Sequence, residues 1–256
     1  MPRNNWTREE LILTFNLYLK IPFGQFHHAN KEVIRLAGLI DRTPSAVAMR
    51  LSNFASVDPF HQNRGIKGLT GGINQVQPIW NEFIGNKEEL LFESERILAN
   101  IEKQTIETKF SDILKGIGDL KGETKIREVK TRVNQNTFRQ IVLANYSGKC
   151  AITSIDIPDL LIASHIIPWS TNEHERLNPE NGICLSPLYD KAFDKGLIGI
   201  DTQYRVILSS VINDRTTKVF YHDYFGKIEG KPIQLPQKYL PKKEFLEWHL
   251  DVVFRT

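Results

Sequence analysis

The sequence predicts an α+β protein with two domains: a helical, helix-turn-helix or winged-helix-like domain over 1–114, and a domain of short strands and helices over 130–256. Three observations predict this class. Apolar residues recur at helical spacing near the N-terminus, glycine and charge dominate 115–124, and short apolar runs bounded by glycine and proline follow. We therefore expect a linker at 115–129.

Three helices are expected at the start of the chain. Residues 6–20 carry a capping-box pattern, Thr7 followed three residues later by Glu10, and then apolar residues at helical spacing. A second helix is expected over 30–39. A third begins after Thr43, which can cap it, with a proline in the first helical position. Two helices joined by so short a turn form a helix-turn-helix layout.

This layout is similar to that of small Myb-like and helix-turn-helix DNA-binding domains. WTREE opens it, and RTPSAVAMRL stands where such domains carry a recognition helix, whose early polar residues meet the DNA. A plain three-helix bundle is the alternative. The glycine-rich segment 54–78 is expected to be a loop or β-wing, and 79–115 is expected to be mostly helical. The resemblance implies DNA contacts from Arg42, Ser45 and Arg50, with Asn53 as a further candidate.

The C-terminal part is expected to alternate short strands and helices. Its elements are a helix over 134–146, strands over 149–153 and 160–167, a helix from Ser186 to Gly196, a strand over 197–201, a strand-like run near 204–210 and a closing helix over 243–254. His249 lies in the apolar pattern of that last helix, so we expect it to pack rather than to react.

Composition excludes several classes of protein. Two cysteines without a CxxC pair cannot build a disulfide framework or a four-cysteine zinc site, which favours a reducing, cytoplasmic setting. No apolar run is long enough to span a membrane, and the N-terminus lacks the apolar core of a signal peptide. The net charge is only +3, but segment 121–150 holds seven Lys or Arg against two Glu. That run is either a solvated helix face or a phosphate-binding face.

Chemistry-bearing residues stand in three ordered pieces: LIASHIIPWS, NPENGICLS and LYDKAFDKG. Taken alone, His165 in its apolar run would be a packed core residue. Asp190 and Asp194 lie one helical turn apart, so both carboxylates share a face and suit Mg²⁺ or Mn²⁺. A histidine beside such a cation can accept a proton from water near neutral pH. Together these residues predict metal-assisted phosphodiester hydrolysis.

The same pieces resemble the HNH endonuclease family, in particular its branch of bacterial restriction endonucleases. The resemblance rests on CAIT, ASHIIPW, NGICLS and FDKG, in that order, and covers about 130–202. It implies a ββα-metal fold around the site. It also implies double-stranded DNA as the substrate and restriction of foreign DNA as the role. We expect a homodimer as one way for a single-metal site to cut both strands.

The resemblance implies a role for each candidate residue. His165 would be the general base, and Asn181 would hold the loop between the strands so that the histidine points correctly. Asp190 takes the third position, usually a histidine that binds the metal, and Asp194 lies one turn later. Ser164 stands where many members carry another metal ligand. We expect one Mg²⁺ or Mn²⁺ ion. We expect no structural zinc, because most of the cysteines that bind zinc in many family members are missing from this chain.

Further DNA contacts are expected around this site. They would come from Arg132, Gln135 and Arg139 on the preceding helix, and from His174 and Arg176 in the polar loop before Asn181. Two competing functions stay open. Ser164, a poor ligand, favours a DNA-binding protein with an inactive HNH finger, and an RNA-directed defence nuclease is the other. Recognition of modified bases by the N-terminal domain is a further hypothesis.

Overall fold

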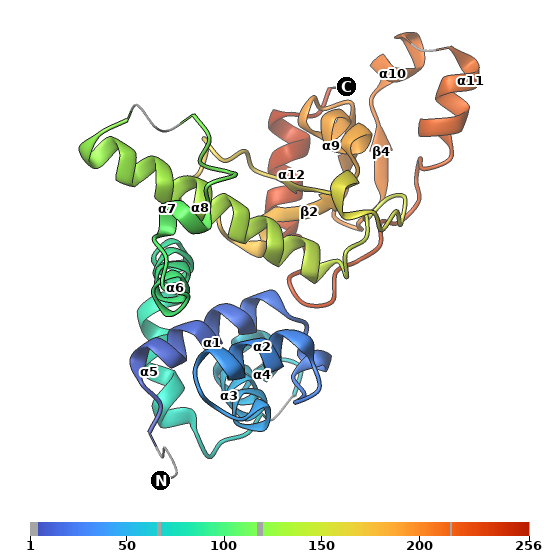
Figure 1. The fold of residues 1–256 in the computed structure, drawn as a ribbon. Coiled ribbons are helices and arrows are strands. Elements are labelled where there is room, and N and C mark those ends of the chain that lie inside the picture. The colour runs from blue at the N-terminus through green and yellow to red at the C-terminus, as the bar shows by residue number, and fades with distance from the viewer. Residues whose placement is uncertain (1–4, 66–67, 117–119, 216, 256) are drawn as a thin grey trace. The chain divides into compact units, whose positions relative to one another are not determined.

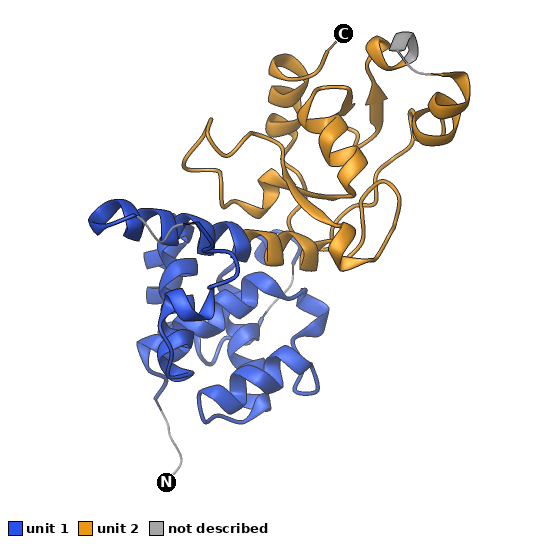
Figure 2. Ribbon diagram, turned by 45° about the horizontal axis from the view of Figure 1, so that its top comes forward, with its two compact units in different colours: residues 1–137 blue, residues 138–256 orange. Residues whose placement is uncertain are grey.

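The computed structural model describes residues 5–65, 68–116, 120–215 and 217–255. The chain forms two compact units, 1–137 and 138–256 (Figure 2). It is an α+β protein, as expected, with many helices and two small two-stranded sheets (Figure 1). In the part of the chain that the structure describes, no helix is both long and apolar enough to cross a membrane.

Helices build the first unit. They are α1 Arg8–Lys20, α2 Lys31–Leu39, α3 Pro44–Val57, α4 Pro59–Gln62, α5 Ile73–Phe83, α6 Lys87–Ile101 and α7 Ile106–Lys109, with a 3-10 turn at Phe23–Gln25. The expected capping box is present, because the Thr7 side chain accepts from the Glu10 amide while the Glu10 side chain accepts from the Thr7 amide. Helix α1 is buried along most of its length, packed against α3, α5 and α6. It is the central helix of the unit.

Helices α2 and α3 form where the sequence predicted helices, with a short turn between them. Asn30 caps α2, and the Thr43 hydroxyl accepts from the Ala46 amide to cap α3. Within the predicted loop or wing at 54–78, α3 runs on to Val57, α4 forms one turn, and α5 begins at Ile73. The described residues of that segment contain no strand. The apolar residues between Phe54 and Val57 extend the buried face of α3, which outweighs the nearby glycines.

Helix α8, Gly122–Asn145, is longer than the helix expected over 134–146. It begins inside the predicted linker at 115–129, of which residues 117–119 lie outside the described part of the chain. The expected domain boundary stays a prediction.

The second unit contains two antiparallel strand pairs. Its elements are β1 Ile162–His165, β2 Gly182–Leu185, α9 Pro187–Asp194, β3 Ile198–Ile200, β4 Val206–Leu208, α10 Ser210–Arg215, α11 Lys218–Phe220, a π-helix at Tyr221–Gly226 and α12 Lys243–Val252, with 3-10 turns at Pro158–Leu160 and Pro179–Asn181. Strands β1 and β2 pair, and α9 follows at once, which gives a ββα unit.

The strand expected at 149–153 is wrong, and the partner of β1 is β2 instead. Residues 150–153 form a tight turn, in which the Ala151 amide donates to Cys184 O at 2.7 Å. Cys150 Sγ accepts from the Ser186 amide at 3.2 Å. A short buried apolar run is compatible with a turn as well as with a strand, so its apolar character misled the assignment.

The end of α12 packs on the end of α9. Gly196 follows α9 with φ +65°, and a side chain there would collide with the Val253 carbonyl. The Arg255 amide donates to Gly196 O at 2.9 Å. Only glycine meets both requirements comfortably, so the sequence at 196 fixes how closely α12 approaches the ββα unit, as the neighbouring ribbons in Figure 1 show.

Candidate active site

The β1–β2 register places His165 opposite Gly182. A side chain at 182 would collide with Val142 and Phe138 of α8, because a Cβ there would come within 2.5 and 2.9 Å of their side chains. Glycine therefore lets the strand lie directly against this helix. Phe138 in turn stacks on the His165 ring, with the ring centroids 4.2 Å apart and the planes 14° from parallel.

The orientation of His165 is set by its hydrogen bond. Its Nε2 lies 2.8 Å from the backbone carbonyl oxygen of Arg176. A carbonyl can only accept, so Nε2 carries the proton and Nδ1 keeps a free lone pair. The Trp169 ring stands nearly perpendicular to the His165 ring, with the ring centroids 5.5 Å apart. The ring is thus held on two sides as a neutral base that can take a proton only at Nδ1.

Burial lowers the pKa of His165 below its ordinary value, while the hydrogen bond to Arg176 and the negative charge of Asp194 work in the opposite direction. The net direction is downward. His165 is therefore neutral at pH 7, which is the protonation state that a general base requires.

Asn181 fixes the loop between the strands. It is fully buried, its Oδ1 accepts from the Ile167 amide at 2.8 Å, and its Nδ2 donates to the carbonyls of Ile167 and Glu175 at 3.0 and 3.2 Å. Its side chain thus joins the start of the loop to the residue just before Arg176, whose carbonyl holds the His165 ring. Asn181 determines the position of His165 through that loop.

Asp190 interacts with Ser164 and Asp194, and Asp194 also acts on His165. Burial raises the pKa of Asp190. The hydroxyl of Ser164 lowers this pKa, and the negative charge of Asp194 raises it. Ser164 is 2% exposed, yet its Oγ makes no hydrogen bond of ordinary geometry to any described residue. A buried hydroxyl normally has a partner. For Ser164 the neighbouring group is the Asp190 carboxylate, whose pKa the hydroxyl lowers.

This donor set fits a hard divalent cation. Among the described residues, no three His, Cys, Asp or Glu side chains come together as a metal cluster. Mg²⁺ commonly takes one or two carboxylates and completes its shell with water and substrate phosphate. Asp190 and Asp194, with the Ser164 oxygen next to Asp190, match that requirement. Cys150 and Cys184 are buried free thiols, and burial raises the pKa of Cys184 to about 12.

A pocket of about 240 Å³ opens beside His165, lined by this residue, Asp194, Lys195 and His249 among others. His249 comes from α12 and was expected only to pack. It stacks on Phe193 at 3.7 Å, its Nε2 donates to the Phe193 carbonyl at 3.0 Å, and its Nδ1 has no partner among the described residues. His249 lies 84 residues after His165 in the sequence. No local sequence pattern distinguishes it from a histidine that only packs in the core.

Replacing His249 with phenylalanine should flatten the acid dependence of stability. Burial lowers the pKa of His249 to about 4, so folding favours its neutral form; that stability is present above the ordinary pKa of 6.5 and is lost as the pH falls toward 4. The loss by pH 5 is about 2 kcal/mol. Urea unfolding at pH 7 and pH 5 should show that loss in the wild type and much less of it in His249→Phe. An equal loss in both proteins would show that His249 does not cause the acid dependence.

The DNA contacts expected on α8 and in the loop before Asn181 are mostly engaged inside the protein. Arg132 pairs with Glu128 at 3.0 Å and donates to the Ile113 carbonyl, and Arg139 donates to the carbonyls of Leu161 and Pro158. Arg176 pairs with Glu173 at 3.1 Å and stacks on Trp169. Gln135 and His174 are exposed.

The contacts expected in the first unit also differ in accessibility. Ser45 is exposed near the start of α3. The Arg42 side chain is 7% exposed and pairs with Glu10 at 2.8 Å. Arg50 is partly buried, and Asn53 is 5% exposed. Arg42 therefore holds α1 and α3 together, whereas Ser45 faces solvent.

A model of the HNH endonuclease family matches residues 150–201. The matched segment runs from Cys150 through β1, β2, α9 and β3, and it contains His165, Asn181, Asp190 and Asp194. No curated protein matches the chain. Helix α12 and the helical first unit lie outside the matched segment.

Proposed function

Since residues 150–201 form an HNH endonuclease domain, we propose that this chain is a divalent-metal-dependent endonuclease that cleaves double-stranded DNA. The observation that supports it best is the bond between His165 Nε2 and the Arg176 carbonyl. That bond leaves Nδ1 as the basic nitrogen of a ring that shares its pocket with Asp194.

In the proposed reaction, His165 Nδ1 takes a proton from water as the water attacks phosphorus. Asn181 keeps the ring oriented through its three hydrogen bonds to the loop. A divalent cation, when bound by Asp190, Asp194 and Ser164, supplies positive charge that offsets the charge on the leaving oxygen. Lys195, which lines the same pocket, can contact a substrate phosphate.

We further propose that the first unit binds the DNA and that the protein acts as a homodimer in restriction of foreign DNA in the cytoplasm. The helix-turn-helix order of α2 and α3 supports the first part, with the exposed Ser45 as a contact. Gln135, exposed on α8, is a further contact. A homodimer would supply two such centres, one for each strand.

Cleavage of supercoiled plasmid should require added Mg²⁺ or Mn²⁺ and should stop with EDTA. We expect Asp190→Asn to raise the Mg²⁺ concentration for half-maximal cleavage by roughly tenfold or more, because a ligand carboxylate is lost. Asp159→Asn, which changes an exposed aspartate outside the site, is the matched control. Cleavage that persists in EDTA would refute the metal requirement.

Two competitors are separated by the choice of substrate. A DNA-binding protein with an inactive finger would bind duplex without cutting it under any of these conditions, an outcome that the unusual Ser164 would then explain. An RNA-directed nuclease would cut RNA and leave both single-stranded and duplex DNA intact. Methylated, hydroxymethylated and plain duplexes in the same experiment test whether cleavage depends on base modification.

A further inference from the structure

A second pocket, in the first unit, lies against α3 and combines apolar walls with an arginine. Its volume is about 290 Å³, and its lining includes Trp6, Met49, Arg50, Leu69 and Gly72. Met49 and Leu69 are 54% and 50% exposed, so large apolar side chains face solvent here. Exposed apolar surface in a concave site is typical of a ligand pocket.

Arg50 brings a cation with unused donors into this pocket. Its Nη1 donates to Asn53 Oδ1 and Gly72 O at 3.2 and 3.3 Å, both long contacts. Its Nε is buried without an acceptor, and no carboxylate among the described residues lies within ion-pair distance of it. Burial and the neighbouring Arg42 lower the pKa of Arg50, which reflects a positive charge that is not offset.

An aromatic ring fixes this guanidinium in place. Trp6 contacts the guanidinium groups of both Arg50 and Arg42, at 4.9 and 4.8 Å from the ring centroid. Arg42 is neutralised by Glu10, but Arg50 is not. The pocket therefore presents a fixed donor group next to apolar surface, and none of the residues that line it is a carboxylate partner for Arg50.

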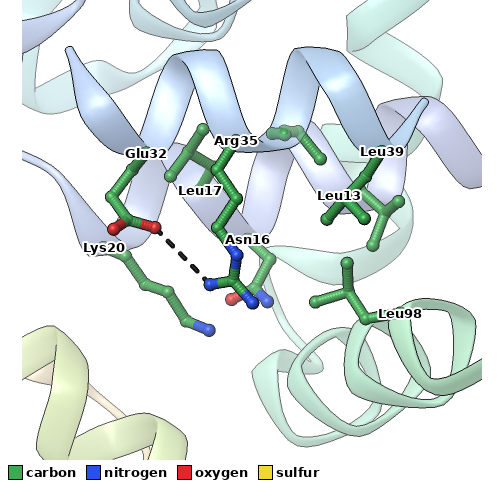
Figure 3. Close-up of a pocket in the computed structure, with 9 residues that line it drawn as sticks. Leu13, Asn16, Leu17, Lys20, Glu32, Arg35, Leu39 and Leu98 are labelled. Carbon is green, nitrogen blue, oxygen red and sulfur yellow. Dashed lines mark ion pairs between the residues drawn. The ribbon is translucent and has the colours of Figure 1, made fainter. Parts of the chain in front are cut away.

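The leucine-lined pocket between α1, α2 and α6 differs in this respect. Figure 3 shows Arg35 at that pocket paired with Glu32, and Lys20 is paired with Glu95 at 2.8 Å. Its cations already have carboxylate partners. Of these two pockets, only the one at Arg50 is lined by a cation that has no carboxylate partner among the described residues.

We propose that the pocket at Arg50 binds an unstacked nucleobase, with its flat faces against Met49 and Leu69 and its acceptor edge at the Arg50 guanidinium. This inference rests on the proposed function, since it assumes a nucleic acid substrate. Guanine fits best, because its O6 and N7 form the acceptor pair that arginine recognises. Unstacked bases commonly lie against apolar and arginine surfaces in proteins. The base could belong to a DNA strand or to a free nucleotide.

The test uses the full chain carrying His165→Ala, so that bound DNA is not cut. Fluorescence anisotropy measures its affinity for a duplex with one unpaired guanine and for the same duplex fully paired, and calorimetry measures its affinity for dGMP. We expect the unpaired guanine to bind about tenfold more tightly than the paired control. Binding of dGMP alone would identify a free nucleotide as the ligand, and preference for the unpaired duplex would identify a base within DNA.

Gly72→Ala provides a steric test of the pocket. A Cβ at 72 would come within 2.3 Å of Asn53 Oδ1 and 2.5 Å of Arg50 Nη1, so it should displace the guanidinium and abolish the preference. Gly38→Ala is the matched control, because a Cβ there meets nothing within 4 Å. Arg50→Met, which keeps the apolar stem, should also abolish the preference, and it covers the case in which Gly72→Ala fails to fold.

Equal affinity for paired and unpaired duplexes, together with no binding of dGMP, would overturn the inference. An unchanged preference in Gly72→Ala and Arg50→Met would overturn it too. These outcomes differ from a failure of the proposed function. If the chain with His165 intact cleaves DNA without base binding, only the pocket assignment is wrong; if it binds the base and cleaves nothing, only the nuclease assignment is wrong.

Discussion

His165→Ala is expected to reduce DNA cleavage by roughly 10² to 10⁴-fold, the usual contribution of a positioned general base. The variant loses the nitrogen that accepts the proton from water, while Phe138 and the loop around Arg176 retain their other contacts. Single-turnover plasmid cleavage with saturating Mg²⁺ measures the effect. Circular dichroism and thermal unfolding should show that the variant remains folded.

The pH dependence of cleavage gives a second view of the same residue. Burial lowers the pKa of His165 below 6.5, the ordinary pKa of histidine. The wild-type rate of cleavage should therefore stay level as the pH falls to 6.5 and should decline only at lower pH. His222→Ala, which alters an exposed histidine outside the site, is the matched control. If His165→Ala cleaves as fast as this control, His165 is not the base.

Asn181→Ala is expected to impair both stability and cleavage. The substitution leaves the buried Ile167 amide without its acceptor and removes two donors, at a cost of about 3 kcal/mol in the free energy of unfolding. Release of the loop should also let the Arg176 carbonyl move, and a displacement of about 1 Å at the reacting group can cost roughly 10²-fold in rate. Urea unfolding and single-turnover cleavage measure the two effects.

Asn172→Ala is the control for this loop. The Asn172 side chain accepts from the amides of His174 and Glu175, and neither bond reaches His165. We expect a small loss of stability and near-normal cleavage. Should Asn181→Ala keep the wild-type rate once it is shown to be folded, the loop does not set the orientation of the base.

Much of this centre could be predicted from residue order because its parts are close in sequence. His165, Asn181 and Asp190 lie within 26 residues of one another, and the ββα connections are short enough that local patterns define them. Strand β2 was not expected from the sequence, because Gly182 and the buried residues after it show no alternation of polar and apolar side chains. A fully buried strand shows no period of two.

The accessibility of the expected DNA-contacting arginines depends on contacts between distant segments. Arg139 was expected to meet DNA, but its donors satisfy the carbonyls of Leu161 and Pro158, about 20 residues away in sequence. Arg42 was expected to meet DNA as well, and it pairs with Glu10. Whether an arginine faces solvent or an internal acceptor depends on tertiary packing. The DNA-binding role of both residues stays a prediction that their internal contacts do not support.

The carbonyl of Arg176 has a consequence for the route of the proton. A carbonyl oxygen cannot take a proton away from Nε2, so the His165 ring cannot act as a two-ended relay that receives at one nitrogen and releases at the other. A proton gained at Nδ1 must leave again from Nδ1. In the proposed reaction, the solvent or the departing product must therefore accept that proton on the same side of the ring before His165 can activate the next water.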